Sequence, residues 1–174
     1  MFRLMFKAVP CPLERLEDLF ALRARVWIAE GADPAAFDAG RWTDGHDAHR
    51  THWMVLDGDQ LVAGASMSLH DRLADMDEPE AYVGLDLPIA GRIAAPARVI
   101  VDAAYRGSGI AQMLLDAQDQ AASAAGAVIA ARQASPAMRR LLERRGWQHR
   151  GAGPADPRFP GVEFSVMTFA PGAP

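Results

Sequence analysis

Apolar residues recur every three or four positions along two long segments, a spacing typical of one face of an α-helix. These segments span residues 13–30 and 108–126, and Gly126 is a favourable residue at a helix C-terminus. Their apolar positions are Leu16, Leu19, Phe20, Val26 and Trp27, followed by Ile110, Met113, Leu114, Ala117, Ala121 and Ala124. A shorter helix is predicted over residues 135–145, because the Ser135 hydroxyl can cap its first turn.

Short runs of apolar and β-branched residues predict the strands. Residues 52–56 and 61–69 flank Asp-Gly-Asp-Gln, and this arrangement predicts a β-hairpin because Asp-Gly suits a tight turn. The other predicted strands are residues 98–102, 127–132, 147–150 and 162–169. Residues 31–50 should form a loop with one short helix, and residues 70–97 show no clear period.

The bulk composition predicts one globular domain over residues 1–174, because half of the residues are hydrophobic. A net charge of −4 argues against general nucleic-acid binding, which needs a basic face. The single cysteine, Cys11, cannot form an internal disulfide, so a reducing compartment is the simplest expectation. Lys7 and the nearby prolines interrupt the apolar N-terminal stretch, which therefore resembles neither a signal peptide nor a membrane span. We expect a cytoplasmic protein with no membrane partner.

The sequence Arg-Gly-Ser-Gly-Ile-Ala, residues 106–111, joins a predicted strand to a predicted helix. Free amides at a helix N-terminus form an anion site, and glycines let a phosphate approach the backbone closely. A ligand-free tight turn is the alternative. A Walker-type phosphate loop is excluded because no Gly-Lys pair occurs in the chain. A dinucleotide site fits poorly, because Gln112 stands where a small residue is needed and the next predicted strand ends in Arg132.

Residues 98–115, RVIVDAAYRGSGIAQMLL, resemble the acyl-CoA-binding motif of the GNAT superfamily of N-acetyltransferases. The order of predicted elements from residue 13 to 169 also matches that family. The resemblance implies an α/β (α+β) GNAT fold, with a central mixed, mostly antiparallel sheet flanked by helices. Two central strands, residues 99–102 and 127–132, would splay apart at the acyl-CoA site.

The resemblance also implies acetyl-CoA as co-substrate and no metal. The pantetheine arm would lie along the strand residues, and the pyrophosphate on the amides of the glycine turn. Ser135 takes a position where many family members have an Asn. The implied cofactor-binding residues are Ile100, Val101, Asp102, Arg106, Gly107, Ser108, Gly109, Ile110, Ala111 and Ser135.

Two residues that the family often uses for proton transfer are absent. Leu142 stands where a Tyr would protonate the departing thiolate, and Ala97 stands where a Glu would accept a proton from the amine. An active enzyme remains consistent with these departures, since transfer from a thioester to an amine mainly needs proximity and a deprotonated amine.

The acceptor side is expected in the N-terminal half, where residues 22–31 and 44–53 faintly resemble autoinducer and N-acyl amino acid synthases. Three histidines, His46, His49 and His52, stand three residues apart there. A metal site, a catalytic or substrate-contacting histidine and a solvated or capping role are the alternatives, and we predict His52 as the titrating catalytic residue. Glu163 could bind or deprotonate an amine, or be a surface carboxylate.

Three tryptophans, Trp27, Trp42 and Trp53, could wall an apolar acceptor pocket, although packing in the core is the default for each.

The sequence therefore predicts an acyltransferase that moves an acetyl group from acetyl-CoA to an amine of a small molecule or peptide. The alternatives are a catalytically silent acyl-CoA-binding sensor and a longer-chain N-acyl amino acid or autoinducer-type synthase. A homodimer is compatible with the sequence.

Overall fold

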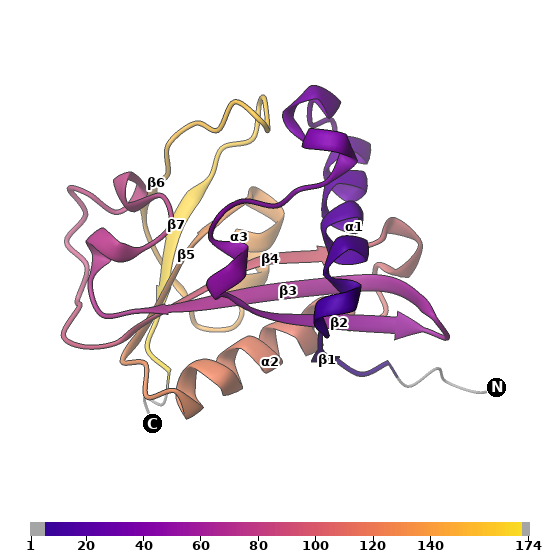
Figure 1. Cartoon of the computed structure of the whole chain (residues 1–174). Coiled ribbons are helices and arrows are strands. Elements are labelled where there is room, and N and C mark those ends of the chain that lie inside the picture. The colour runs from indigo at the N-terminus through magenta and orange to yellow at the C-terminus, as the bar shows by residue number, and fades with distance from the viewer. Residues whose placement is uncertain (1–5, 172–174) are drawn as a thin grey trace. The chain divides into compact units, whose positions relative to one another are not determined.

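The computed structural model of the chain describes residues 6–171, so the first five residues of the N-terminal stretch lie outside it (Figure 1). The chain divides into two compact units. Unit 1 contains residues 6–66 and 98–118, and unit 2 contains residues 67–97 and 119–171. The single domain expected over the whole chain stays a prediction.

Unit 1 contains helix α1 (Leu16–Ala29) and the first two strands of the chain, β1 (Val9–Pro10) and β2 (Thr51–Asp57). β1 pairs antiparallel with β2. The predicted hairpin connects β2 to β3 (Gln60–His70), and Gly58 adopts the expected positive φ of 59° in its turn. β1 was not predicted, because a two-residue strand ending in proline has no alternating pattern.

The core of unit 1 requires a close approach of α1 to β3. Leu19 is fully buried on the predicted apolar face of α1. A Cβ on Gly64 of β3 would lie 2.3 Å from Leu19 Cδ1 and 3.0 Å from the Trp53 carbonyl oxygen. Only glycine fits at this position without movement of its neighbours.

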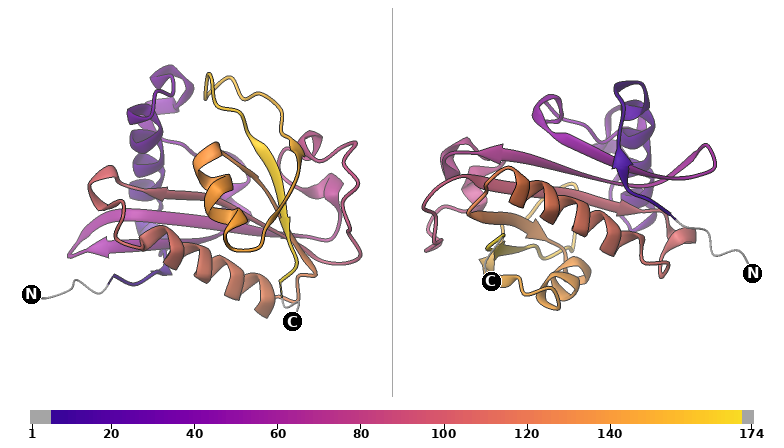
Figure 2. Two further views of the ribbon diagram at one scale, coloured as in Figure 1. Left: turned by 180° about the vertical axis from the view of Figure 1, so that it is seen from behind. Right: turned by 90° about the horizontal axis from the view of Figure 1, so that it is seen from below.

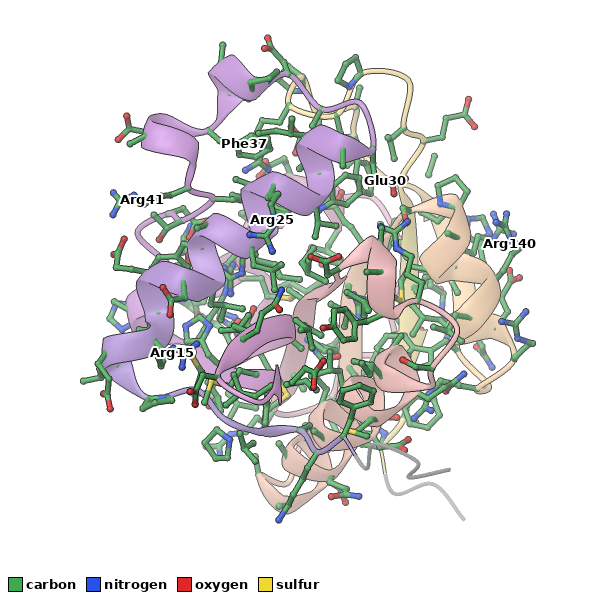
Figure 3. All side chains as sticks on the ribbon, turned by 90° about the vertical axis from the view of Figure 1, so that its right-hand side faces the viewer. Arg15, Arg25, Glu30, Phe37, Arg41 and Arg140 are labelled. Carbon is green, nitrogen blue, oxygen red and sulfur yellow. The ribbon has the colours of Figure 1, made fainter. Side chains whose placement is uncertain are left out.

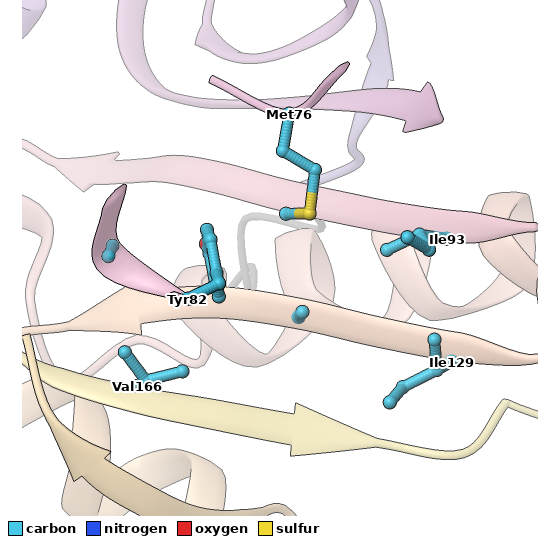
Figure 4. Packing of buried hydrophobic residues seen from close by; sticks show 7 residues of the cluster. Met76, Tyr82, Ile93, Ile129 and Val166 are labelled. Carbon is cyan, nitrogen blue, oxygen red and sulfur yellow. The ribbon is translucent and has the colours of Figure 1, made fainter. Parts of the chain in front are cut away.

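Unit 2 contains β5 (Ile129–Ala134), α3 (Pro136–Glu143), β6 (Gln148–Ala152) and β7 (Ser165–Phe169). β7 pairs antiparallel with both β5 and β6. A core cluster seen from close by in Figure 4 consists of Met76, Ala81, Tyr82, Ile93, Ile129, Ala131 and Val166. The Ser135 hydroxyl accepts a hydrogen bond from the Met138 amide, which confirms the predicted cap of α3.

Strands β3 and β4 (Ile93–Val101) each run through both units. The sheet therefore has seven strands in the order β1-β2-β3-β4-β5-β7-β6, with β4 and β5 parallel. Helices α1, α3 and α2 (Ile110–Ala124) flank this mixed, mostly antiparallel sheet, as predicted, and Figure 2 shows the same elements from behind and from below.

Two strand boundaries differ from the prediction by three residues or more. β4 begins at Ile93 and not at residue 98. The prediction was wrong because Pro96 lies inside the strand, and a proline in a sequence argues against a strand. β7 begins at Ser165 and not at residue 162. No helix in residues 6–171 has the length and apolar composition needed to cross a membrane.

Candidate functional site

The glycine turn of unit 1 joins β4 to α2 with the geometry of an anion site. Gly107 and Gly109 have φ angles of 79° and 87°, which residues with a Cβ rarely adopt. A Cβ on either glycine would meet no heavy atom within 4 Å, so the space beside the turn is open. The first amides of α2 lack partners within the helix and its dipole favours an anion there, so a phosphate fits this turn.

The strand before the turn offers peptide groups on one edge. The Asp102 amide donates to the Val62 carbonyl oxygen at 2.9 Å, so Asp102 is already paired to β3. Because alternate residues of a strand direct their peptide groups to opposite edges, Val101 directs its N–H and C=O away from β3. By the same alternation, Ile100 directs its peptide group to the same side as Asp102. The Val101 carbonyl oxygen lies 3.4 Å from Arg106 Nε, and the pantetheine contacts of Ile100, Val101 and Asp102 stay predictions.

Charged side chains from α1 and its C-cap pair with the residue after β4 and with the first residue of the glycine turn. Arg25 Nη2 lies 3.2 Å from Asp102 Oδ2, and Glu30, at the C-cap of α1, lies 2.6 Å from Arg106 Nη1. Figure 3 labels Arg25 and Glu30 along this helix. A hydrogen bond from the Ala104 amide, with the nearby Arg25 charge, lowers the pKa of Asp102. The motif arginine is thus held by a carboxylate of the same unit.

A largely buried group of charged side chains surrounds His52 in unit 1. This arginine–aspartate cluster consists of Arg23, Asp44, Asp47, Arg50, His52 and Arg98. Arg23 comes from α1, His52 from β2, Arg98 from β4, and the others from the loop before β2. The sequence did not predict this cluster, although the position of Arg23 among the apolar residues of α1 was a detectable signal.

Asp47 is the centre of the cluster. Its Oδ1 lies 2.9 Å from Arg23 Nη1 and 3.3 Å from Arg50 Nη1. Its Oδ2 accepts from the Thr43 hydroxyl at 2.9 Å and the Asp44 amide at 3.1 Å. Burial alone would raise the pKa of Asp47, but the neighbouring arginines outweigh burial and hold it well below its usual range. Asp47 is therefore a carboxylate at all ordinary pH values.

Arg23 is fully buried, and burial lowers its pKa to about 10, although Asp47 opposes this effect. It still carries a charge at neutral pH.

His52 is also buried, and both of its ring nitrogens have partners. Nε2 lies 2.9 Å from the Asp47 carbonyl oxygen, and Nδ1 lies 3.1 Å from Arg23 Nη2. These partners assign a proton to Nε2 and a lone pair to Nδ1. Burial lowers the pKa of His52, so the ring is neutral at pH 7. It could accept a proton from an amine only after the Arg23 contact breaks, and its predicted catalytic role stays a prediction.

The other two histidines do not join His52. His46 and His49 are exposed at the short helical turn before β2, whereas His52 points inward. Among residues 6–171, no three His, Cys, Asp or Glu side chains are placed to hold a metal ion.

The tryptophans of this region take part in packing. Trp42 and Trp53 are buried, and Trp27 lies edge-on to Trp42 with ring centroids 6.2 Å apart.

Three predicted or substituted positions lie in unit 2. Ser135 caps α3 with its hydroxyl oxygen, and Glu163 is exposed in the loop before β7. Leu142 is fully buried on α3, so the position of the family tyrosine is a hydrocarbon in the core. The cofactor contact of Ser135 and the amine contact of Glu163 stay predictions.

Known proteins resemble this chain in sequence pattern and in fold. A model of the acetyltransferase (GNAT) family matches residues 15–147. A search of curated proteins found no match to the sequence.

Several solved structures are similar to the chain. FeeM, an N-acyl amino acid synthase from uncultured soil microbes, is 14% identical with a TM-score of 0.68, over 95% of this chain and 91% of its own. Arylalkylamine N-acetyltransferase 2 from Aedes aegypti is 14% identical with a TM-score of 0.69, over 95% and 98%. A predicted acetyltransferase from Clostridium acetobutylicum, determined with acetyl-CoA, is 19% identical with a TM-score of 0.60, over 83% and 90%. At these identities the likeness concerns the fold.

Proposed function

Because the chain belongs to the acetyltransferase (GNAT) family, we propose that it transfers an acetyl or longer acyl group from a coenzyme A thioester to an amine. The observation that carries this proposal is the glycine turn, with two left-handed glycines, open space beside them and Arg106 at its start. Its features match the needs of a pyrophosphate: backbone donors, a helix N-terminus and a positive charge.

The residues of the chain have distinct roles in this proposal. The amides of residues 107–111 and the Arg106 guanidinium bind the pyrophosphate, and Ser135 adds a hydroxyl contact. The peptide group of Val101 holds the pantetheine arm, and its N–H is oriented as a donor to the thioester oxygen when charge develops there. A bound coenzyme A thioester would supply the activated acyl group: a C–N bond to the amine forms, the C–S bond breaks, and coenzyme A leaves as a thiolate. No metal takes part in the proposed reaction.

Proton transfer is assigned to less usual groups. We assign the amine contact to Glu163, whose side chain is exposed in the loop before β7. His52 is the other candidate base, and it acts only if binding of the acceptor releases its Nδ1 from Arg23. A base that acts through water can replace the absent glutamate at Ala97.

The first experiment is isothermal titration with coenzyme A. Wild-type protein should bind, and Gly109→Trp should lose most of the affinity because the indole fills the turn. Gly84→Trp is the matched control: Gly84 has a similar φ of 82° and also no heavy atom within 4 Å of an added Cβ, but it lies in a loop of unit 2. Absence of binding by the wild type would refute the proposal.

A second candidate function is a catalytically silent acyl-CoA-binding sensor. Three observations favour it: a buried leucine at position 142, an alanine at position 97, and a histidine whose two nitrogens are engaged. Thiol release from acetyl-CoA with a panel of small amines, amino acids and peptides separates the two functions. Tight coenzyme A binding without release for any acceptor would establish the sensor.

The same assay with acyl chains of increasing length tests the N-acyl synthase variant. A preference for long chains would support that variant, and a preference for acetyl would support an acetyltransferase. His52→Gln and Glu163→Gln, measured beside the wild type, show which side chain the turnover needs.

A further inference from the structure

Arg98 has an unusual backbone conformation for a residue within a strand. Its φ is +56°, in the left-handed region that residues with a Cβ avoid. Such conformations persist only where the surrounding structure holds them, and they often occur at functional sites. Arg98 is the first residue of β4 that belongs to unit 1. The rest of β4 in this unit, Val99–Val101, follows it directly.

The Arg98 side chain is anchored in the loop before β2. Only 8% of it is exposed. Its guanidinium lies over the Trp42 ring, 4.5 Å from the centroid, and forms ion pairs with Asp44 and, at 3.6 Å, with Asp47. The backbone of Arg98 is thus held by its own side chain, which has two charged partners and one aromatic partner.

The anchor continues to α1. The Trp42 amide donates to the Phe20 carbonyl oxygen of α1 at 3.0 Å, and Arg23 of α1 holds Asp47. Two residues further along the same helix, Arg25 pairs with Asp102. Residues 98–102 are therefore fixed by α1 at both ends: through the arginine–aspartate cluster before Val99 and through a direct ion pair after Val101.

The direction of the Val101 peptide group depends on this arrangement. In a strand the side to which a peptide group points alternates with each residue, and one irregular residue changes the side for everything after it. Arg98 is that residue in β4. If the Arg98 backbone relaxed to an extended conformation, the N–H and C=O of Val101 would no longer point away from β3.

We propose that Arg98 is a positioning residue for acyl-CoA: held by Asp44 and Trp42, its left-handed backbone orients the Val101 peptide group toward the pantetheine arm. The inference rests on the proposed function. Asp44 then acts indirectly, by holding the Arg98 side chain. Neither side chain needs to touch the ligand.

The experiment compares two ligands in isothermal titration: coenzyme A, and its nucleotide half, 3′-phospho-ADP, which has the pyrophosphate but no pantetheine. Asp44→Asn and Arg98→Lys should weaken coenzyme A binding by about three- to tenfold, which lies within the range of indirect coupling effects. Both should leave the affinity for 3′-phospho-ADP unchanged. Arg106→Gln is the reference, because it should weaken both ligands.

Controls separate positioning from loss of structure. Asp75→Asn breaks an exposed ion pair with Arg72 in unit 2 and should change neither affinity. Thermal denaturation of every variant defines a temperature at which all of them are folded, and binding is measured there. Arg98→Ala should have a larger effect on coenzyme A than Arg98→Lys, since it loses the whole anchor.

Each outcome is decisive. Equal losses for both ligands in Asp44→Asn would show a general structural role, and unchanged coenzyme A affinity in Asp44→Asn and Arg98→Lys would show no role; either overturns the inference. If the wild type binds coenzyme A, either of these results for the variants leaves the proposed function intact. Absence of wild-type binding removes both.

Discussion

Replacement of Asp47 by asparagine should destabilise the protein strongly. Asparagine has the size of aspartate, but it carries no charge and one of its two polar atoms donates instead of accepting. Arg23 would then remain fully buried beside a neutral amide, and the donors of Thr43 and Asp44 or of the two arginines would face an NH₂ group.

The magnitude follows from burial. Removing one partner of a buried ion pair costs about 3–5 kcal/mol, because the remaining charge is left uncompensated. Arg98 and Arg50 retain Asp44 as a partner, whereas Arg23 forms its ion pair with Asp47. We therefore expect a loss of about 3–5 kcal/mol from a free energy of unfolding that is typically about 5–15 kcal/mol.

Urea denaturation at pH 7, followed by tryptophan fluorescence, measures this loss. Because the pKa of Asp47 is depressed in the folded state, its contribution is fully present above the unfolded pKa of about 3.9 and is lost as the pH falls toward the folded pKa. The difference between wild type and Asp47→Asn should therefore narrow in acid. Asp75→Asn, at an exposed pair, is the control. A loss below about 1 kcal/mol, the size of a surface pair, would refute the reasoning.

Three further changes have defined outcomes. His52→Gln should reduce the loss of stability between pH 7 and pH 5 in urea denaturation, because a buried histidine with a lowered pKa stays neutral while the unfolded chain takes up a proton below about pH 6.5. Gly64→Ala should lower the free energy of unfolding by about 1–3 kcal/mol in the same assay, because the added methyl group would overlap α1 and the β2 backbone. Glu30→Gln should tighten coenzyme A binding by about two- to fivefold in isothermal titration, since it releases Arg106 from an exposed ion pair and removes a negative charge near the pyrophosphate.

Each of these has a matched control. His149→Gln, at an exposed position of β6, should keep the wild-type pH dependence, and Gly45→Ala, with no heavy atom within 4 Å of the added Cβ, should change stability little. Glu17→Gln breaks a comparable exposed pair with Arg41 and should not alter coenzyme A affinity. An unchanged pH slope, a neutral alanine at position 64, or weaker binding by Glu30→Gln would contradict the respective prediction.

The glycine turn could be predicted because its determinants are local. The two glycines lie between an apolar strand and an amphipathic helix that directly precede and follow them in the chain. Both glycines have the positive φ that glycine adopts readily. The hairpin and the serine cap of α3 could be predicted for the same reason.

The arginine–aspartate cluster could not be assembled from the sequence, because its members are distant in the chain. Arg23 and Asp47 are 24 residues apart, and Asp44 and Arg98 are 54 apart. Charged residues are usually exposed, so a charge pattern alone favours a solvated face. The left-handed backbone of Arg98 has no local signal either, since it is imposed by partners outside its own strand.

Helix α1 acts as a fixed template for residues 98–106. Between Arg23 and Glu30 the helix rises about 10 Å. Over this length Arg23 contacts Arg98 indirectly, because both pair with Asp47. Arg25 pairs directly with Asp102, and Glu30 pairs directly with Arg106. One residue inserted after Arg25 would rotate Glu30 by about 100° and break its contact. Insertions and deletions should therefore be rejected within these two turns of helix.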